Sequence, residues 1–229
     1  MKKPNSCMIV LLLLLIAQFS MASDSKEQYR KVIIDFLCRN RFALQYDATL
    51  VSNDGKVNPV SADNSIVVRD ELALYTSTQR ADYVINTEGS VIVNHPLKKI
   101  TINYNPYTES EKEDLSASLN EQLAARMLKV IDGCDSVTQK KLNGYTIFTT
   151  YAANTPYVKA ECWVKGKNEI KEVRYYLKES DYLYERIVYK SLPFDQFAGK
   201  ADFSNYVVLK DDRYTPTPKY KMYEIVVGK

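Results

Sequence analysis

Alternation of apolar and polar residues in the middle of the chain predicts a series of short antiparallel strands. The clearest is Lys99–Tyr104, in which three apolar residues alternate with three polar ones. Because successive side chains of a strand point to opposite faces, this segment has one apolar and one polar face. Similar patterns predict strands over Ile66–Thr76, Asp82–Asn86 and Ser90–Val93. A curved antiparallel sheet with one apolar face is therefore the expected centre of the fold.

Strands are also expected on both sides of this central group. One precedes it at Arg41–Val51 and ends at the hairpin turn Asn53-Asp54-Gly55. The others follow it, at Leu142–Tyr151, Tyr157–Val164, Glu169–Leu177, Tyr184–Leu192 and Tyr220–Val227.

Apolar residues at helical spacing predict two amphipathic helices. In the first, Tyr29, Val32, Ile33, Phe36 and Leu37 recur at i, i+3, i+4, i+7 and i+8. The second spans Glu109–Asp132 and opens with a capping box at Thr108–Glu111. Its apolar face consists of Leu115, Leu119, Leu123, Met127, Val130 and Ile131. Each stripe has to be buried, and the apolar face of the sheet is the obvious surface to cover.

The first 22 residues have the three parts of a secretory signal peptide. Lys2 and Lys3 precede the apolar run Met8–Ala17, and Ser20-Met21-Ala22 supplies the small residues of a cleavage site. We therefore expect cleavage after residue 22, no membrane anchor, and a periplasmic or secreted protein. No Pro- or Gly-rich linker divides residues 23–229, so a single domain is expected.

Charge and cysteine content narrow the possible functions further. Removal of Lys2 and Lys3 lowers the formal net charge from +3 to +1, and so nearly neutral a chain is not expected to bind nucleic acid. The remaining cysteines are Cys38, Cys134 and Cys162. An odd number at wide spacing does not indicate a disulfide framework. Buried thiols are one interpretation, and a Cys38–Cys134 disulfide between the ends of the two helices is the other.

The segments Asp82–Asn86, Glu88–Val93 and His95–Ile102 form a local motif of strand, glycine turn, strand, proline turn and strand. This motif resembles that of the periplasmic outer-membrane lipoprotein carriers and their relatives, the LolA-, LolB- and RseB-like family. Glu169–Val173 resembles a later strand. The chain departs from the pattern at Gly89, which lacks the usual following Lys and aromatic pair, and at His95 before the proline.

The resemblance implies an α+β fold in which the curved antiparallel sheet forms an unclosed β-barrel, a half-barrel, with helices covering its concave face. In the carriers this cavity shields acyl chains from water. Exposing one CH₂ group of an acyl chain to water costs about 0.8 kcal/mol of free energy. The corresponding cavity residues here would be Leu72, Leu74, Tyr83, Ile85, Val91, Val93, Ile100, Ile102 and Tyr104. The lid would consist of Ile33, Phe36, Leu119, Leu123 and Met127. Periodicity equally allows all of these residues to form a filled core.

Residues with catalytic or metal-binding chemistry are sparse. His95 is the single histidine, no nucleophile elbow accompanies it, and there is no H-E-x-x-H, C-x-x-C or Gly-rich phosphate loop. We expect His95 to be a solvated turn residue, and we expect no metal, no cofactor and no enzymatic activity. The 18 tyrosines either line a lipid- or sugar-contacting surface or fill ordinary strand positions.

The sequence thus predicts an exported soluble envelope protein, monomeric, that binds a lipid or the acyl chains of a lipoprotein as a carrier or chaperone. The alternative is a non-catalytic structural or adaptor protein of the envelope that binds another protein with the same scaffold. A hydrolase that depends on His95 is a third, weaker possibility.

Overall fold

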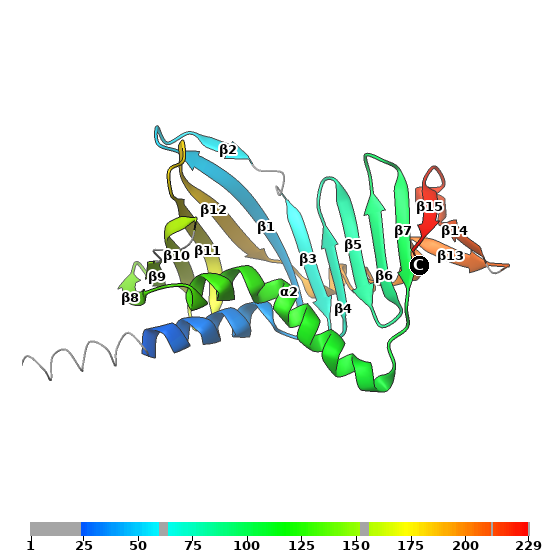
Figure 1. Cartoon of the computed structure of the whole chain (residues 1–229), viewed down its shortest axis with the longest axis horizontal. Coiled ribbons are helices and arrows are strands. Elements are labelled where there is room, and N and C mark those ends of the chain that lie inside the picture. The colour runs from blue at the N-terminus through cyan, green and yellow to red at the C-terminus, as the bar shows by residue number, and fades with distance from the viewer. Residues whose placement is uncertain (1–23, 60–63, 152–155, 212, 229) are drawn as a thin grey trace, which may run out of the picture.

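The computed structural model describes residues 24–59, 64–151, 156–211 and 213–228. The expected signal peptide lies outside the described residues. Residues 24–37 form the N-terminal helix, drawn in blue in Figure 1. The second helix, α2 (Lys112–Asp132), follows a short 3₁₀ turn, η1 (Glu109–Glu111). Neither is long and apolar enough to cross a membrane, and the described residues hold no other helix that is.

Most of the described chain is β-strand. The strands are β1 (Arg41–Ser52), β2 (Val57–Pro59), β3 (Ser65–Asp70), β4 (Ala73–Ser77), β5 (Ala81–Asn86), β6 (Gly89–Asn94), β7 (Lys99–Tyr104), β8 (Ser136–Leu142), β9 (Tyr145–Tyr151), β10 (Tyr157–Lys165), β11 (Glu169–Leu177), β12 (Tyr182–Ser191), β13 (Val207–Lys210), β14 (Arg213–Pro216) and β15 (Glu224–Val227). Short 3₁₀ turns η2 (Phe194–Gln196), η3 (Phe203–Asn205) and η4 (Pro218–Tyr220) interrupt the C-terminal segment.

Thirteen of these strands form one curved sheet in the order β15-β7-β6-β5-β4-β3-β1-β12-β11-β10-β9-β8, with β2 paired to β1. The sheet does not close on itself, and both helices lie across its hollow side (Figure 1). The predicted α+β half-barrel with helices on the concave face is thus confirmed. Strands β13 and β14 form a separate hairpin.

Three details differ from the prediction. The segment expected as one strand at Ile66–Thr76 is the hairpin β3–β4, which turns at Glu71 with a left-handed φ of 55° and no Gly, Pro or Asn to signal it. The segment expected at Leu142–Tyr151 is the end of β8 plus β9, joined through Asn143-Gly144, with φ of 49° and 80°. Finally, the strand expected at Tyr220–Val227 is only β15 (Glu224–Val227), since Tyr220 ends the turn η4. This strand pairs with β7 in parallel, whereas the other described pairings are antiparallel.

The main core lies between the N-terminal helix, the C-terminal half of α2 and strands β1 and β8–β12. All five residues of the predicted stripe of the N-terminal helix are buried there, and Tyr29 stacks on Phe148 with ring centroids 4.9 Å apart. Register places one residue from each of five adjacent strands in a row beneath the helices: Phe148, Cys162, Val173, Ile187 and Ala48.

The opposite face of the sheet is covered by the C-terminal segment, residues 192–211 and 213–228. Phe203, Tyr206 and Tyr220 of this segment pack on apolar side chains of β5, β6 and β7. The Asn86 side-chain amide also donates a hydrogen bond to the Ala201 carbonyl at 2.9 Å. The helices therefore lie on the concave face, and the C-terminal segment covers β5–β7 on the opposite face.

The predicted capping box at the start of the second helix is present. The Glu111 carboxylate accepts hydrogen bonds from the Thr108 backbone N–H at 2.8 Å and from the Thr108 hydroxyl at 2.7 Å. These hydrogen bonds hold the pKa of Glu111 below its ordinary value. The predicted apolar face is likewise confirmed, since Leu115, Leu119, Met127, Val130 and Ile131 are buried.

Gly89 should be the glycine least tolerant of substitution. It begins β6 with a φ of 133°, and a Cβ at this position would lie 2.1 Å from the Asn103 carbonyl oxygen. At Gly144, φ is 80° but a Cβ would meet no atom within 4 Å. We expect Gly89→Ala to lower the free energy of unfolding by about 2 kcal/mol more than Gly144→Ala does. Equal losses in urea unfolding would contradict this reading of the hairpin.

Candidate functional site

A cavity lies between α2 and the concave face of the sheet. It has a volume of about 330 Å³ and is bounded by α2, the end of the N-terminal helix and strands β1, β3, β4, β11 and β12. Its walls are mainly aliphatic and aromatic: Leu37, Phe42, Leu44, Tyr46, Val67, Leu74, Thr76, Gln122, Leu123, Arg126, Met127, Tyr175, Ile187 and Tyr189. The volume lies near the lower end of the roughly 300–1,000 Å³ typical of small-molecule sites.

Strand register brings the sheet side of this cavity together. Tyr46 of β1 lies opposite Tyr189 of β12, while Leu44 of β1 lies opposite Val67 of β3. Val67 in turn lies opposite Thr76 of β4. Since directly paired residues share a face, the cavity floor is one continuous surface across four neighbouring strands.

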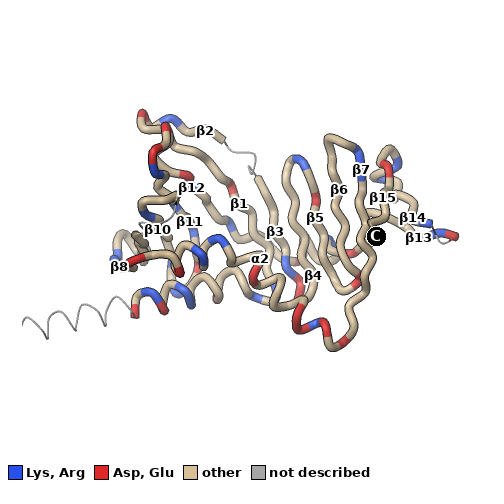
Figure 2. The backbone as a smooth tube through the Cα atoms, viewed as in Figure 1, with Lys and Arg blue, Asp and Glu red and all other residues tan. Residues whose placement is uncertain are grey.

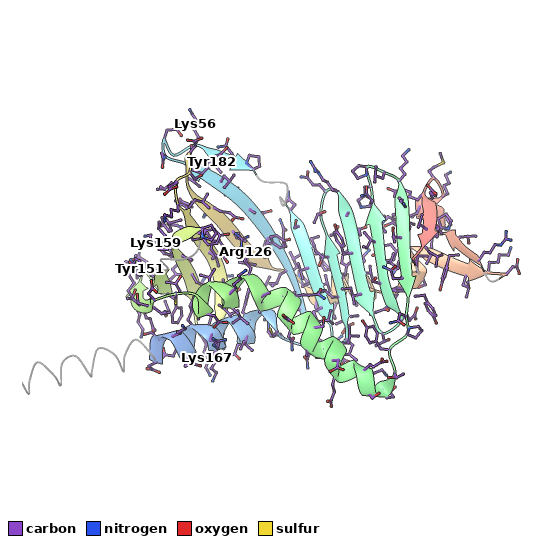
Figure 3. The ribbon with its side chains drawn as sticks, in the orientation of Figure 1. Lys56, Arg126, Tyr151, Lys159, Lys167 and Tyr182 are labelled. Atoms are coloured by element: carbon purple, nitrogen blue, oxygen red, sulfur yellow. The ribbon has the colours of Figure 1, made fainter. Side chains whose placement is uncertain are left out.

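Arg126 provides a cation at the rim of the cavity. It projects from α2 toward the β10–β12 part of the sheet (Figure 3), where its guanidinium pairs with Glu185 and donates to the Tyr157 hydroxyl at 3.1 Å. The guanidinium carbon also lies 4.3 Å from the centre of the Tyr175 ring. Burial lowers the pKa of Arg126, but the hydrogen bond to Glu185 outweighs it, so the pKa is raised. Arg126 therefore stays charged and fixed against the sheet.

Two tyrosines of the cavity wall remain neutral over a wide pH range. Burial raises the pKa of both Tyr175 and Tyr189 well above the ordinary value for a phenol. Their rings therefore present apolar surface, and their hydroxyls act as hydrogen-bonding groups. Together with Arg126 and Gln122, they give an otherwise apolar cavity a few polar groups.

The N-terminal half of α2 is fastened to the sheet by a buried arginine. Arg69 of β3 is fully buried. Its Nε donates to the Glu71 carbonyl at 3.0 Å, and its terminal nitrogens donate to the Asn120 side-chain oxygen and, at 3.4 Å, to the Ser116 hydroxyl. Burial lowers the pKa of Arg69. Among the described residues no carboxylate forms an ion pair with it, so its charge is held by neutral oxygens alone.

Some of the predicted cavity and lid residues line this cavity or adjoin it. Leu74, Leu123 and Met127 line it directly. Leu72, Ile85 and Leu119 pack beside it in a small cluster with Leu74 and Leu115. Tyr83 lies on the same face, opposite Thr76, and is 45% exposed. The two lid residues of the N-terminal helix, Ile33 and Phe36, are buried in the main core instead.

The other predicted cavity residues lie on the opposite face. Val91, Val93, Ile100 and Ile102 are buried beneath the C-terminal segment, and Tyr104 is exposed beside Tyr214. The physical reason is the two-residue turn Thr87-Glu88, which places Ile85 opposite Ser90 rather than opposite Val91. Val91 and Val93, and with them their partners Ile102 and Ile100, therefore cannot share a face with Leu74 and Ile85.

Several residues that line the cavity were not predicted, because they come from β1, β11 and β12. Tyr46, Tyr175, Ile187 and Tyr189 lie far from the central strands in sequence, and only the pairing of β1 with β12 brings them to α2. The abundance of tyrosine was the available signal, but composition does not locate a residue.

His95 and the cysteines lie away from the cavity. His95 was expected to be solvated, but it is half-buried on the opposite face, 3.1 Å from the Tyr223 hydroxyl and 3.5 Å from Asp82. Cys38, Cys134 and Cys162 are free thiols, and burial raises the pKa of Cys162 to about 12. No group of three or more His, Cys, Asp or Glu in the described ranges is placed to hold a metal ion.

No protein-family model and no curated protein matches the chain. Solved structures that it resembles include an uncharacterized conserved protein from Thermus thermophilus (9% identity, 87% of this chain and 99% of that one, TM-score 0.41). Another is a putative outer membrane lipoprotein-sorting protein domain from Vibrio parahaemolyticus, with 10% identity over 76% of this chain and 96% of that one and a TM-score of 0.32. A LolA superfamily protein from Nitrosomonas europaea has 10% identity over 76% of this chain and 96% of its own, with a TM-score of 0.26.

Proposed function

We propose that the chain is a non-catalytic carrier of the cell envelope that binds a lipid or an acyl chain of a lipoprotein in the cavity beneath α2. On this proposal residues 1–22 are a cleaved signal peptide. Residues 23–229 then act as a single, monomeric domain in the periplasm or outside the cell.

The observation that carries the proposal is an apolar cavity that remains between an amphipathic helix and the concave face of the sheet. A filled core would leave no space there, because protein interiors are packed as densely as organic crystals. The volume of this cavity, about 330 Å³, suits one alkyl chain or a molecule of similar size. A ligand with several acyl chains would require α2 to move away from the sheet.

The attachment of α2 is consistent with such movement. Its N-terminal half is fastened by Arg69, whose partners are the neutral oxygens of Asn120 and Ser116. Because burying a charge without a counter-ion is costly, the solvation that Arg69 gains when α2 moves away offsets part of the lost hydrogen bonding. The C-terminal half of α2, by contrast, is anchored in the main core through Met127, Val130 and Ile131.

Binding of a fluorescent fatty acid tests the proposal directly. A dissociation constant of about 1 μM corresponds to about 8 kcal/mol, which the burial of about ten methylenes would supply. We expect affinity in this range, with competition by an unlabelled long-chain fatty acid and none by butyrate. Native mass spectrometry of gently purified protein should show a co-purified lipid.

The adaptor alternative predicts the opposite result. If neither a bound lipid nor probe binding is found up to about 100 μM, the cavity does not serve an acyl chain. The scaffold would then be better explained as a protein-binding surface.

A further inference from the structure

Two turns meet at one end of β7 and β15. Because β15 runs parallel to β7, the turn that enters each strand lies at the same end of the sheet. The Glu224 backbone N–H donates to the Lys98 carbonyl at 2.9 Å, and the Tyr223 hydroxyl lies 3.1 Å from His95 Nδ1. The β4–β5 turn joins them, since the His95 N–H donates to the Arg80 carbonyl at 2.9 Å. Three separate parts of the chain thus form one rigid end.

The two most exposed large hydrophobic side chains of the described residues project from this end. Leu97, in the β6–β7 turn, is 71% exposed, and Met222, in the turn before β15, is 69% exposed. The Leu97 backbone is held in place, because its N–H donates to the Asn94 side-chain oxygen at 3.0 Å. Folding alone gives no reason for either residue to be apolar.

Cations surround these two side chains. Arg80, Lys98, Lys219 and Lys221 are all exposed, and Glu224 is the exposed carboxylate beside them. In Figure 2, blue segments, which mark Lys and Arg, lie at the tops of the β4–β5 and β6–β7 turns and in the loop before β15. Across the part of the chain that the structure describes, none of these four cations forms an ion pair. We call Arg80, Leu97, Lys98, Lys219, Lys221 and Met222 the basic tip.

We propose that the basic tip docks the protein on the surface of an anionic lipid bilayer. Lysine and arginine side chains are attracted to anionic headgroups, and apolar side chains between them enter the boundary between headgroups and acyl chains. The tip has both components on a rigid support. The arrangement is therefore typical of a reversible, peripheral contact.

A bilayer fits the tip better than an acidic protein partner does. Leu97 and Met222 protrude as single side chains, and neither lines the cavity beneath α2. A stable protein interface buries about 800 Å² on each side around a well-packed apolar centre, which two isolated side chains do not provide. A bilayer needs no such complementary shape.

Co-sedimentation with vesicles tests the proposal on the full-length mature chain. We expect binding to phosphatidylcholine vesicles that contain about 30% phosphatidylglycerol, and at least tenfold weaker binding to vesicles of phosphatidylcholine alone. Raising the salt concentration to about 1 M, where the Debye length falls to about 3 Å, should release most of the protein. Equal binding to both vesicle types, or none to the anionic ones, would overturn the proposal.

Two variants separate the charged and apolar contributions. Leu97→Ser/Lys98→Glu/Lys221→Glu should weaken binding at least tenfold. Its matched control is Lys140→Glu/Lys141→Glu/Leu142→Ser, which makes the same exchanges among exposed residues at the β8–β9 turn and should retain binding. A similar loss in the control would mean that overall charge, not the tip, drives binding.

Leu97→Ser/Met222→Ser keeps every charge and should weaken binding about fivefold. If it binds vesicles normally, Leu97 and Met222 do not enter the bilayer and the proposed docking contact is wrong. If poly-glutamate binds the wild type as tightly as the vesicles do, the tip is a docking site for acidic protein. All the substituted side chains are exposed, so circular dichroism should be unchanged. The fatty-acid assay contains no vesicles, and its outcome is independent of this one.

Discussion

Replacing Leu123 by Trp should weaken binding of the fluorescent fatty acid by about 50-fold. Leu123 lies on the cavity-facing side of α2, where it lines the cavity with Leu74 and Met127. The larger indole would occupy space that the proposed ligand needs. Excluding about three methylenes costs about 2.4 kcal/mol, which corresponds to a loss of this size.

The matched control is Leu128→Trp. Leu128, like Leu123, is half-buried on α2 and packs against the main core, but it does not line the cavity. We expect this variant to lose stability through overpacking while the folded fraction keeps the wild-type affinity. Equal affinities for the two variants would place the bound probe elsewhere on the protein.

Replacing Arg69 by Ala should lower the free energy of unfolding by about 3 kcal/mol. The change removes three hydrogen bonds and leaves the Asn120 side chain, the Ser116 hydroxyl and the Glu71 carbonyl without their donor. Removing the buried charge of Arg69 is favourable, but it offsets only part of the stability lost with these hydrogen bonds. Because two of the three hydrogen bonds reach α2, amide exchange should accelerate in the first half of that helix before it does so elsewhere.

Arg41→Ala is the control for this variant. Arg41 lies on the neighbouring strand and pairs with Asp70 at 3.0 Å, but its side chain is 59% exposed. An exposed pair of this kind contributes about 0–1 kcal/mol, so the control should be close to wild type. If Arg69→Ala also lies within about 1 kcal/mol of wild type, or if α2 exchanges no faster, Arg69 does not fasten the helix.

Local patterns were sufficient to predict most of the elements. Lys99–Tyr104 and Glu169–Leu177 match β7 and β11 residue for residue, and every residue of the predicted stripe of the N-terminal helix is buried. These predictions succeeded because each depends on a short-range period. The turn at Glu71 had no such signal, since a glutamate there adopts a conformation that usually favours Gly or Asn. The Asn143-Gly144 turn did have one and could have been recognised.

The composition of the cavity wall was harder to predict, because it depends on which face each strand presents. A shift of one residue in register moves all apolar residues of a strand to the other side of the sheet. Counting across the two-residue turn Thr87-Glu88 would have separated Ile85 from Val91. No local pattern, however, indicated that the C-terminal segment would cover β5–β7.

The pairing of β1 with β12 has a consequence for the order of folding. Leu44 lies opposite Ser191, so β1 meets β12 only after most of the chain has been synthesised, whereas its other neighbour, β3, follows closely in sequence. Contacts so distant in sequence slow folding, because a long loop has to close before they form. The cavity wall, to which β11 and β12 contribute, is therefore completed only after these long-range contacts form.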